Sequence, residues 1–339
     1  DRLPDPPTRT GELTVRVLLT GMGGDFGART ANAVEADPAV DAVLGLDAHP
    51  PRRRLHGSEF RRIDPRDETR TAAAVREFAP TVVLHLGVWE PDARAAPASA
   101  HQRTMAGTRA ALGAAVSAGR LEHILVRSGI EAYGRGPGTP RRPDEATELR
   151  PTSPYGRTLQ AVEQEAVAAG RTADVPVALL RFAPTVGVQY PSPLSRLLRL
   201  PIVPVNALSL TCVAPAAFSL LDVEDAAAAF LAALQRRVDG PVNVVPEGTI
   251  TPLAAARVGG RLPLPIVAPG WIPTRLVSRA IGAPIPSHLH ELLLRGREAD
   301  GSRAEEVLGV TPRRTTEDVV RALYDWAPVV YLRPGQAVA

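Results

Sequence analysis

The chain of 339 residues contains no lysine, and all 39 of its basic residues are arginine. A lysine amine forms Schiff bases, holds pyridoxal phosphate and completes the GK[ST] phosphate loop. These chemistries are therefore excluded, together with any active site that tunes a tyrosine by means of a neighbouring lysine. Codon bias in a GC-rich genome accounts for a general exchange of lysine for arginine, but it does not restore the missing ammonium group.

The chain also has a single cysteine, a small net charge and no long hydrophobic run. Cys212 is the only cysteine, which excludes an intramolecular disulfide and a multi-cysteine zinc site. No apolar run reaches the ~18 residues of a membrane span, and the opening DRLPDPPTRTGE does not read as a signal peptide. The net charge of +3 is small for this length, which gives no support for a nucleic-acid or membrane partner. We expect a cytoplasmic protein whose residues 1–12 are disordered.

The first half of the chain alternates short apolar runs with alanine-rich helical stretches. Strands are expected at 15–21, 42–47, 81–87, 123–129 and 175–184, with helices at 28–37, 69–80, 98–118 and 155–169. Continuous apolar strands joined by helices are typical of a parallel sheet covered on both faces. From about residue 185 prolines break the pattern, apart from a helix at 223–238 and a strand at 242–246. The sequence therefore predicts an α/β fold, a Rossmann-type doubly wound parallel sheet with a smaller C-terminal substrate domain.

The turn after the first strand carries a glycine motif. It reads Thr20-Gly21-Met22-Gly23-Gly24-Asp25-Phe26-Gly27. In such a motif one glycine allows the tight turn, one lets a pyrophosphate approach the backbone, and one permits close helix–strand packing. The following helix N-terminus favours the phosphates. Asp47 ends the next strand, where an acidic residue binds the adenosine ribose. This context predicts a dinucleotide site formed by Gly21, Gly24, Asp25, Phe26, Gly27 and Asp47.

The sequence leaves the choice between NAD and NADP open. Asp47 favours NAD because its carboxylate accepts hydrogen bonds from the ribose hydroxyls. Three arginines, 52 to 54, follow closely, and an arginine there can hold the 2′-phosphate of NADP through two hydrogen bonds. We take Arg52 as the candidate contact and expect NADPH as the cofactor, with NADH as the alternative.

The domain limits follow from the change of pattern and from this motif. Residues 13–184 are predicted to form the NAD(P)-binding Rossmann domain. Residues 185–330 are predicted to be mainly a substrate-binding domain, of which 212–246 return to the Rossmann core. Residues 331–339 are expected to form a tail.

Further motifs are spread over residues 13–330. They are Asp64-Pro65-Arg66-Asp67, His85-Leu86-Gly87, Ala106-Gly107-Thr108, Ser153-Pro154-Tyr155-Gly156-Arg157-Thr158 and Leu221-Asp222-Val223-Glu224-Asp225. Together with the glycine turn they resemble the extended short-chain dehydrogenase/reductase family, the NAD-dependent epimerase/dehydratase group. The resemblance implies further cofactor contacts: Asp64 and Pro65 beside the adenine, Leu86 and Gly87 near the nicotinamide ribose, and Ala183 and Pro184 near the carboxamide.

The same resemblance implies a catalytic tetrad of Asn, Ser/Thr, Tyr and Lys, most of which is missing. Thr104, Gly129 and Leu159 stand at the Asn, Ser/Thr and Lys positions, and only Tyr155 is retained. Ser128 is a candidate substitute, although adjacent strand residues point to opposite faces. Without the lysine, the pKa of Tyr155 should stay near ~10, so the hydroxyl is protonated at neutral pH. Such a tyrosine can donate a proton but is a poor base.

These losses favour reduction of a carbonyl over oxidation of an alcohol. General acid–base help is typically worth ~10²–10⁴ in rate, so weakening it slows hydride transfer without forbidding it. A quinone-like or phenol-flanked ketone supplies part of the missing activation itself. We therefore expect an NAD(P)H-dependent ketoreductase of an aromatic ketone, working with substrate assistance. This resembles atypical ketoreductases of aromatic polyketide antibiotic biosynthesis, such as those of angucyclinone (simocyclinone) assembly.

Two other functions stay open. A non-catalytic NAD(P)-binding sensor or scaffold needs the glycine turn but no tetrad. A sugar-nucleotide epimerase or dehydratase begins by oxidising an alcohol, and therefore needs the base that this chain lacks. Assays of cofactor oxidation with ketones, quinones and nucleotide sugars would separate the three.

Other residues have a structural and a functional interpretation. The seven histidines show no metal-ligand pattern, so no metal is expected. His85 and Tyr133 are expected to be structural. Trp89, Tyr190 and Trp271 either line an aromatic substrate pocket or pack in the core. The apolar segment 194–204 is expected to be a lid or the surface of a homodimer.

Overall fold

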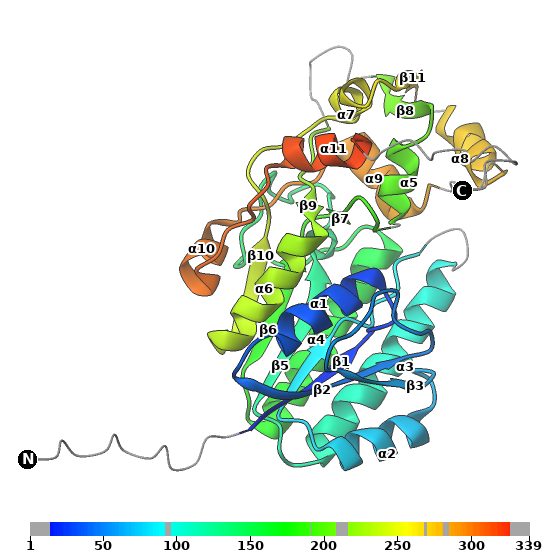
Figure 1. The fold of residues 1–339 in the computed structure, drawn as a ribbon. Coiled ribbons are helices and arrows are strands. Elements are labelled where there is room, and N and C mark those ends of the chain that lie inside the picture. Colours follow the sequence, from blue (N-terminus) through cyan, green and yellow to red (C-terminus); the bar gives the residue numbers. More distant parts are fainter. Residues whose placement is uncertain are drawn as a thin grey trace, which may run out of the picture.

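A seven-stranded parallel sheet forms the centre of the molecule, with the strand order β10-β6-β5-β4-β1-β2-β3 (Figure 1). The strands are β1 (Val15–Thr20), β2 (Val40–Asp47), β3 (Glu59–Arg62), β4 (Val82–His85), β5 (His123–Gly129), β6 (Val177–Phe182) and β10 (Gly240–Val244). This confirms the predicted α/β fold. The order in which the chain adds strands to the sheet reverses between β1 and β4. In open α/β sheets, ligands bind outside the carboxyl ends of the strands at such a point.

The computed structural model describes residues 14–91, 96–190, 192–207, 216–267, 270–280 and 285–325. Residues 1–12, Cys212 and residues 331–339 lie outside these ranges, so the predicted N-terminal disorder and tail stay predictions. No helix within the described ranges is long and apolar enough to cross a membrane.

Helices cover both faces of the sheet. Their bounds are α1 (Asp25–Glu35), α2 (Glu68–Phe78), α3 (Pro97–Ser117), α4 (Pro154–Ala173) and α6 (Val223–Gln235). Helices α2, α3 and α4 pack side by side on one face, and α1 and α6 pack together on the other (Figure 1). Strand β1 shows how the sequence supplies both cores: Leu18 belongs to one cluster, and Val17 and Leu19 belong to the other. Alternate side chains of a strand point to opposite faces, so a continuous apolar run fills both layers.

Side-chain caps fix where the helices begin. Ser153 accepts a hydrogen bond from the Gly156 amide, and Pro154 occupies the first helical position of α4. Both residues are typical of a helix start. Tyr155 is thereby held in the first turn of α4, beside the carboxyl end of β5. The short helix η1 (Ile130–Tyr133) follows β5 directly.

A smaller unit with its own core lies beyond the carboxyl ends of the strands (Figure 1). Its elements are α5 (Pro193–Leu198), β8 (Ile202–Asn206), α7 (Pro252–Val258), β11 (Leu262–Ile266), α8 (Trp271–Ala280), α9 (Ser287–Arg295) and α11 (Thr316–Tyr324). Of the remaining elements, β7 (Thr185–Val186) pairs with β9 (Leu221–Asp222), and α10 (Ser302–Leu308) packs near β10. Leu194, Leu197 and Leu198 are buried, and β8 pairs with β11. These leucines belong to the core of the smaller unit, whereas Ile202 is exposed, and the lid or dimer surface expected for 194–204 stays a prediction. Trp271 packs in the same core.

Candidate active site

The glycine turn leaves an open approach to the N-terminus of α1. Gly21 has φ +77°, and a Cβ there would collide with the backbone of Gly87. A Cβ on Gly27 would collide with the carbonyl of Gly21. Gly24, in contrast, caps α1 without any side-chain hydrogen bond and has room for a Cβ, 3.6 Å from the Gly21 oxygen. The first and third glycines are needed for packing, and the middle one leaves free space for an anion at the helix N-terminus.

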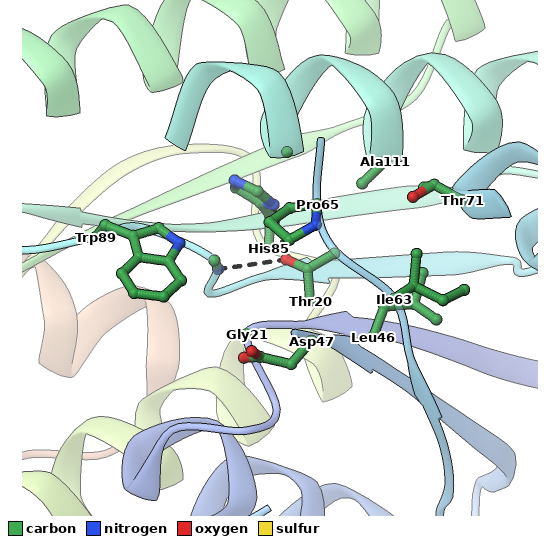
Figure 2. A pocket seen from close by; sticks show the side chains of 12 residues that line it. Thr20, Gly21, Leu46, Asp47, Ile63, Pro65, Thr71, His85, Trp89 and Ala111 are labelled. Carbon is green, nitrogen blue, oxygen red and sulfur yellow. Dashed lines mark hydrogen bonds between the residues drawn. The ribbon is translucent and has the colours of Figure 1, made fainter. Parts of the chain in front are cut away.

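A cavity runs from this turn between β1, β2 and β4 (Figure 2). It is lined by Thr20, Gly21, Leu46, Asp47, Ile63, Pro65, Thr71, His85, Gly87, Trp89, Gly107 and Ala111. The carboxylate of Asp47 lies beside Gly21 and accepts hydrogen bonds from the amides of Gly23 and His49, both at 3.0 Å (Figure 2). A carboxylate has about four lone-pair sites, so both oxygens keep acceptor capacity for a ribose. The predicted contacts Gly21, Asp47, Pro65 and Gly87 thus meet in one place.

His85 is a structural residue of this cavity, as expected. Its Nδ1 lies 2.8 Å from the Thr20 hydroxyl and its Nε2 lies 2.9 Å from the Thr108 hydroxyl. The same Thr20 oxygen accepts a hydrogen bond from the Gly87 amide (Figure 2). Burial lowers the pKa of His85 to about 4. A neutral imidazole therefore ties β1, β4 and α3 together behind the expected cofactor.

In the arginine triplet 52–54, Arg53 lies beside the N-terminus of α1, whereas the sequence favoured Arg52 as the cofactor contact. Arg52 is exposed, whereas Arg53 is half-buried and donates to Asp25 Oδ1 at 2.9 Å and to Gln189. Arg29 donates to the other oxygen of Asp25 at 2.7 Å. Two guanidinium groups therefore neutralise the carboxylate in the first turn of α1, where an anion is expected.

Two predicted cofactor residues are occupied elsewhere by their side chains. Phe26 packs against the rings of Phe182 and Phe230, with centroids 5.7 and 5.9 Å away, so only its backbone can face a cofactor. Asp64 pairs with Arg66, and the hydrogen bonds from Arg66 lower the pKa of Asp64 to about 2. Leu86 is buried in the core next to this region.

A second cavity lies at the carboxyl ends of β5 and β6. It is lined by Glu90, Arg127, Ser128, Gly129, Glu131, Tyr155, Phe182, Ala183, Pro184, Thr185, Ser192, Leu194, His288 and Leu289. It brings together the predicted residues Tyr155, Ser128, Ala183 and Pro184. Sequence reasoning missed the charged and titratable groups among them, which are Glu90, Arg127, Glu131 and His288.

Tyr155 is buried in this cavity, with 6% of its surface exposed. Burial raises its pKa above the ordinary value of 10.0, Arg127 opposes the rise, and Glu90 and Glu131 add to it. The value near ~10 expected for Tyr155 holds only in the absence of another perturbation, and burial is such a perturbation. Leu159, at the lysine position, is fully buried and apolar. The tyrosine is thus held firmly in its protonated form.

Ser128 belongs to a buried network. Its hydroxyl donates to Glu163 Oε1 at 2.5 Å, and Glu163 accepts two hydrogen bonds from Arg181 at 2.9 and 2.7 Å. Arg181 also donates to the hydroxyl of Tyr133, which donates to Asn243. The network joins β5, α4, β6 and β10. It makes Tyr133 structural, as expected, and it commits the hydroxyl proton of Ser128 to Glu163.

The remaining candidates are fixed by neighbours. Thr104, at the Asn position of the tetrad, accepts a hydrogen bond from the Trp89 amide at 3.0 Å. The guanidinium of Arg103 lies 4.7 Å above the Trp89 ring. Burial raises the pKa of Tyr190, and Arg127 opposes this rise by its charge and a hydrogen bond. In the described residues no group of three or more His, Cys, Asp or Glu side chains could hold a metal ion.

Comparison with known proteins identifies the class to which this site belongs. Residues 17–245 match the NAD dependent epimerase/dehydratase family. The chain is a member of that family of oxidoreductase-type enzymes. An uncharacterized protein, Rv0501, of Mycobacterium tuberculosis is 28% identical over 319 residues, which cover 88% of this chain and 81% of the relative. Its counterpart Mb0513 in Mycobacterium bovis matches equally well.

Solved structures share the fold over nearly the whole chain. UDP-glucose 4-epimerase of Thermotoga maritima, solved with UDP-glucose, has a TM-score of 0.71 at 18% identity and covers 92% of this chain and 98% of its own. UDP-glucose 4-epimerase of Thermus thermophilus, in complex with NAD, has a TM-score of 0.70 at 23% identity, with 92% and 98% covered. The dTDP-glucose 4,6-dehydratase of Bacillus anthracis, also with NAD, has a TM-score of 0.69 at 16% identity, with 92% and 96% covered. At these identities the likeness establishes the fold.

Proposed function

We propose that this protein is a nicotinamide-dependent reductase of an activated ketone. The observation that carries the proposal is the environment of Tyr155, whose hydroxyl is buried and whose usual lysine partner is replaced by Leu159. Oxidation of an alcohol needs a base, and a tyrosine with a raised pKa is a poor one. A protonated tyrosine can instead stabilise the negative charge that develops on a carbonyl oxygen during reduction.

The cofactor assignment rests on the first cavity. A reduced nicotinamide supplies the hydride that the carbonyl carbon accepts. Asp47 would hold the adenosine ribose, the amides at the start of α1 would face the pyrophosphate, and Arg53 stands beside them. The 2′-phosphate of NADPH would be repelled by the negative charge of Asp47. Arg52, which could compensate for this charge, is exposed and does not line the cavity. We therefore favour NADH over the NADPH that the arginine triplet indicated. NAD in the Thermus epimerase structure agrees with this choice.

The substrate assignment rests on the second cavity. Its lining combines the apolar side chains of Phe182, Leu194 and Leu289 with charged groups. Arg127 is one of these, and a guanidinium there would stabilise a phenolate or the charge delivered to a quinone. This supports a phenol-flanked aromatic ketone, of the kind found in polyketide antibiotics, as the substrate class.

Turnover with defined carbonyl compounds tests the proposal. We expect oxidation of NADH by hydroxylated anthraquinones and related ketones, and a clear loss in Tyr155→Phe. A loss of less than about threefold would remove Tyr155 from the mechanism. Because solved relatives include UDP-glucose 4-epimerases, UDP-glucose belongs in the same panel. NAD-dependent conversion of that sugar, without oxidation of NADH by any ketone, would replace the proposed function by an epimerase.

A further inference from the structure

The place of the missing Ser/Thr side chain in the second cavity is filled by another residue. Gly129 stands at that position with extended backbone, φ −154°, which any residue can adopt. A Cβ built on it would collide with Oε2 of Glu131 and would lie 3.2 Å from Cδ1 of Leu159. The carboxyl group of Glu131 thus reaches back from η1 into the volume of the lost hydroxyl, and a side chain at 129 would have to displace it.

The carboxyl group of Glu131 is protonated more readily in the folded protein than it would be in water. Its side chain is buried, with 8% of the residue exposed. Burial raises its pKa from the ordinary 4.5, Arg297 and His288 oppose the rise, and Glu90 adds to it. Tyr155 also faces the cavity, but its own pKa is shifted far above neutrality. A carboxylic acid that is protonated in the folded protein can donate its proton to a developing oxyanion, and the raised pKa of Glu131 favours that form.

A second observation indicates that the cavity receives a polar ligand. His288 Nε2 lies 3.0 Å from Glu90 Oε1, which orients the ring. His288 is 3% exposed, and its Nδ1 is buried without a hydrogen-bond partner among the described residues. The ring lies 4.9 Å from that of Tyr155 and lines the same cavity. Buried polar atoms are normally paired, so this ring nitrogen is available to a polar group of a ligand in the cavity.

We propose that Glu131 is a catalytic residue, the acid that protonates the carbonyl oxygen of the substrate from the position of the missing Ser/Thr hydroxyl. The role rests on the proposed ketone reduction. As the carbonyl carbon gains its hydride, the π pair of the C=O bond moves to the oxygen. The O–H bond of Glu131 breaks, the new O–H bond of the alcohol forms, and the carboxylate takes a proton from solvent. Tyr155 donates a hydrogen bond to the same oxygen, and His288 with Glu90 binds a polar substituent of the substrate.

Glu131→Gln is the decisive variant, because it keeps the shape of the side chain and removes the transferable proton. With 1,8-dihydroxyanthraquinone and NADH, we expect kcat to fall ~10²–10⁴-fold, the usual value of general acid help, with little change in KM for NADH. Glu148→Gln is the matched control, since Glu148 pairs with Arg150 on the surface. Wild-type kcat should also fall as the pH rises through the raised pKa of Glu131, and this fall should vanish in Glu131→Gln. The groups facing Glu131 that must be considered in that profile are Glu90, His288, Arg297, Tyr155 and Arg127.

Two further measurements test the protonation and the location of Glu131, and the first does not require turnover. Difference infrared spectra of the cofactor-free protein should show a carboxylic acid band near neutral pH that is lost in Glu131→Gln. A rescue variant tests the location: Gly129→Ser should be damaging alone, because it collides with Glu131, but should raise kcat at least about tenfold when added to Glu131→Ala.

The outcomes separate this inference from the proposed function. Normal ketone reduction by Glu131→Gln, within about threefold of wild type, would overturn the role of Glu131 and leave the reductase intact, as would the absence of the infrared band. Failure of the wild-type protein to oxidise NADH or NADPH with every carbonyl compound would overturn the proposed function and, with it, the catalytic role of Glu131.

Discussion

The buried ion pair between Glu163 and Arg181 makes a prediction whose size can be worked out. Both side chains are 6% exposed, and the carboxylate accepts two hydrogen bonds from Arg181 and one from Ser128. Removing one partner of a buried pair costs ~3–5 kcal/mol because the other charge stays buried and unpaired. Glu163→Gln keeps one acceptor oxygen, so we expect a loss near the lower limit, about 3 kcal/mol. In a chain of this size that corresponds to about 4 °C in Tm.

The assay is thermal and denaturant unfolding of the variant beside a control with the same chemical change. Glu317→Gln removes the charge of an exposed i,i+4 pair with Arg321, which should cost less than about 0.5 kcal/mol. Glu163→Leu combined with Arg181→Met removes both charges and should cost less than Glu163→Gln alone. Equal losses in Glu163→Gln and Glu317→Gln would refute the reasoning, since burial is the only basis for the difference.

Four other variants test the first cavity. The pKa of His85 is about 4 in the folded protein against an ordinary 6.5, so its contribution to stability is present above pH 6.5 and is lost as the pH falls through 4. We expect the wild type to lose about 3 kcal/mol from this group, and His85→Asn to show a correspondingly flatter pH dependence in denaturant titrations; parallel curves would contradict this. Asp47→Asn removes the like charge beside a 2′-phosphate, so the ratio of kcat/KM for NADPH over NADH should rise about tenfold, and an unchanged ratio would place the ribose elsewhere. Gly21→Ala should destabilise the fold by ~1–3 kcal/mol, because φ is +77° and a Cβ meets the Gly87 backbone. Gly24→Ala should leave Tm unchanged while weakening NADH binding, as fluorescence titration would show.

The sequence was informative where local chemistry determines local structure. Continuous apolar strands predicted the sheet, Ser153 and Pro154 marked the start of α4, and the glycines at 21 and 27 are needed for the conformation in which they are found. The edge strand β3 was missed because Glu59–Arg62 is mostly polar and lacks the apolar run of a buried strand. The helix α5 and the strand β8 were not recognised in 193–206, because prolines interrupt the apolar pattern there.

The candidate site was predicted only in part, because its chemistry depends on contacts between distant segments. Glu90 follows β4 and His288 begins α9, and no spacing in the sequence joins them. One local feature of the sequence pointed to Glu131. It is an acidic residue two positions after Gly129, which stands where a hydroxyl residue was expected at the end of an apolar strand. The sequence favoured Ser128 instead, because its hydroxyl is the nearest one along the chain. The hydroxyl proton of Ser128 is directed to Glu163.

The absent lysine and the proposed acid are two aspects of one change. Leu159 lies 3.2 Å from the position that a Cβ of Gly129 would take, and the carboxyl of Glu131 occupies that same volume. A lysine at 159 would bring an ammonium group to this carboxyl, and a neighbouring positive charge lowers the pKa of a carboxylic acid. Arg297 and His288 already lower the pKa of Glu131 in this way, against the effect of burial. An apolar residue at 159 adds no further positive charge, and so favours the protonated carboxyl that the proposed role of Glu131 needs. General arginine-for-lysine exchange does not account for leucine here, whereas the chemistry of the neighbouring carboxyl does.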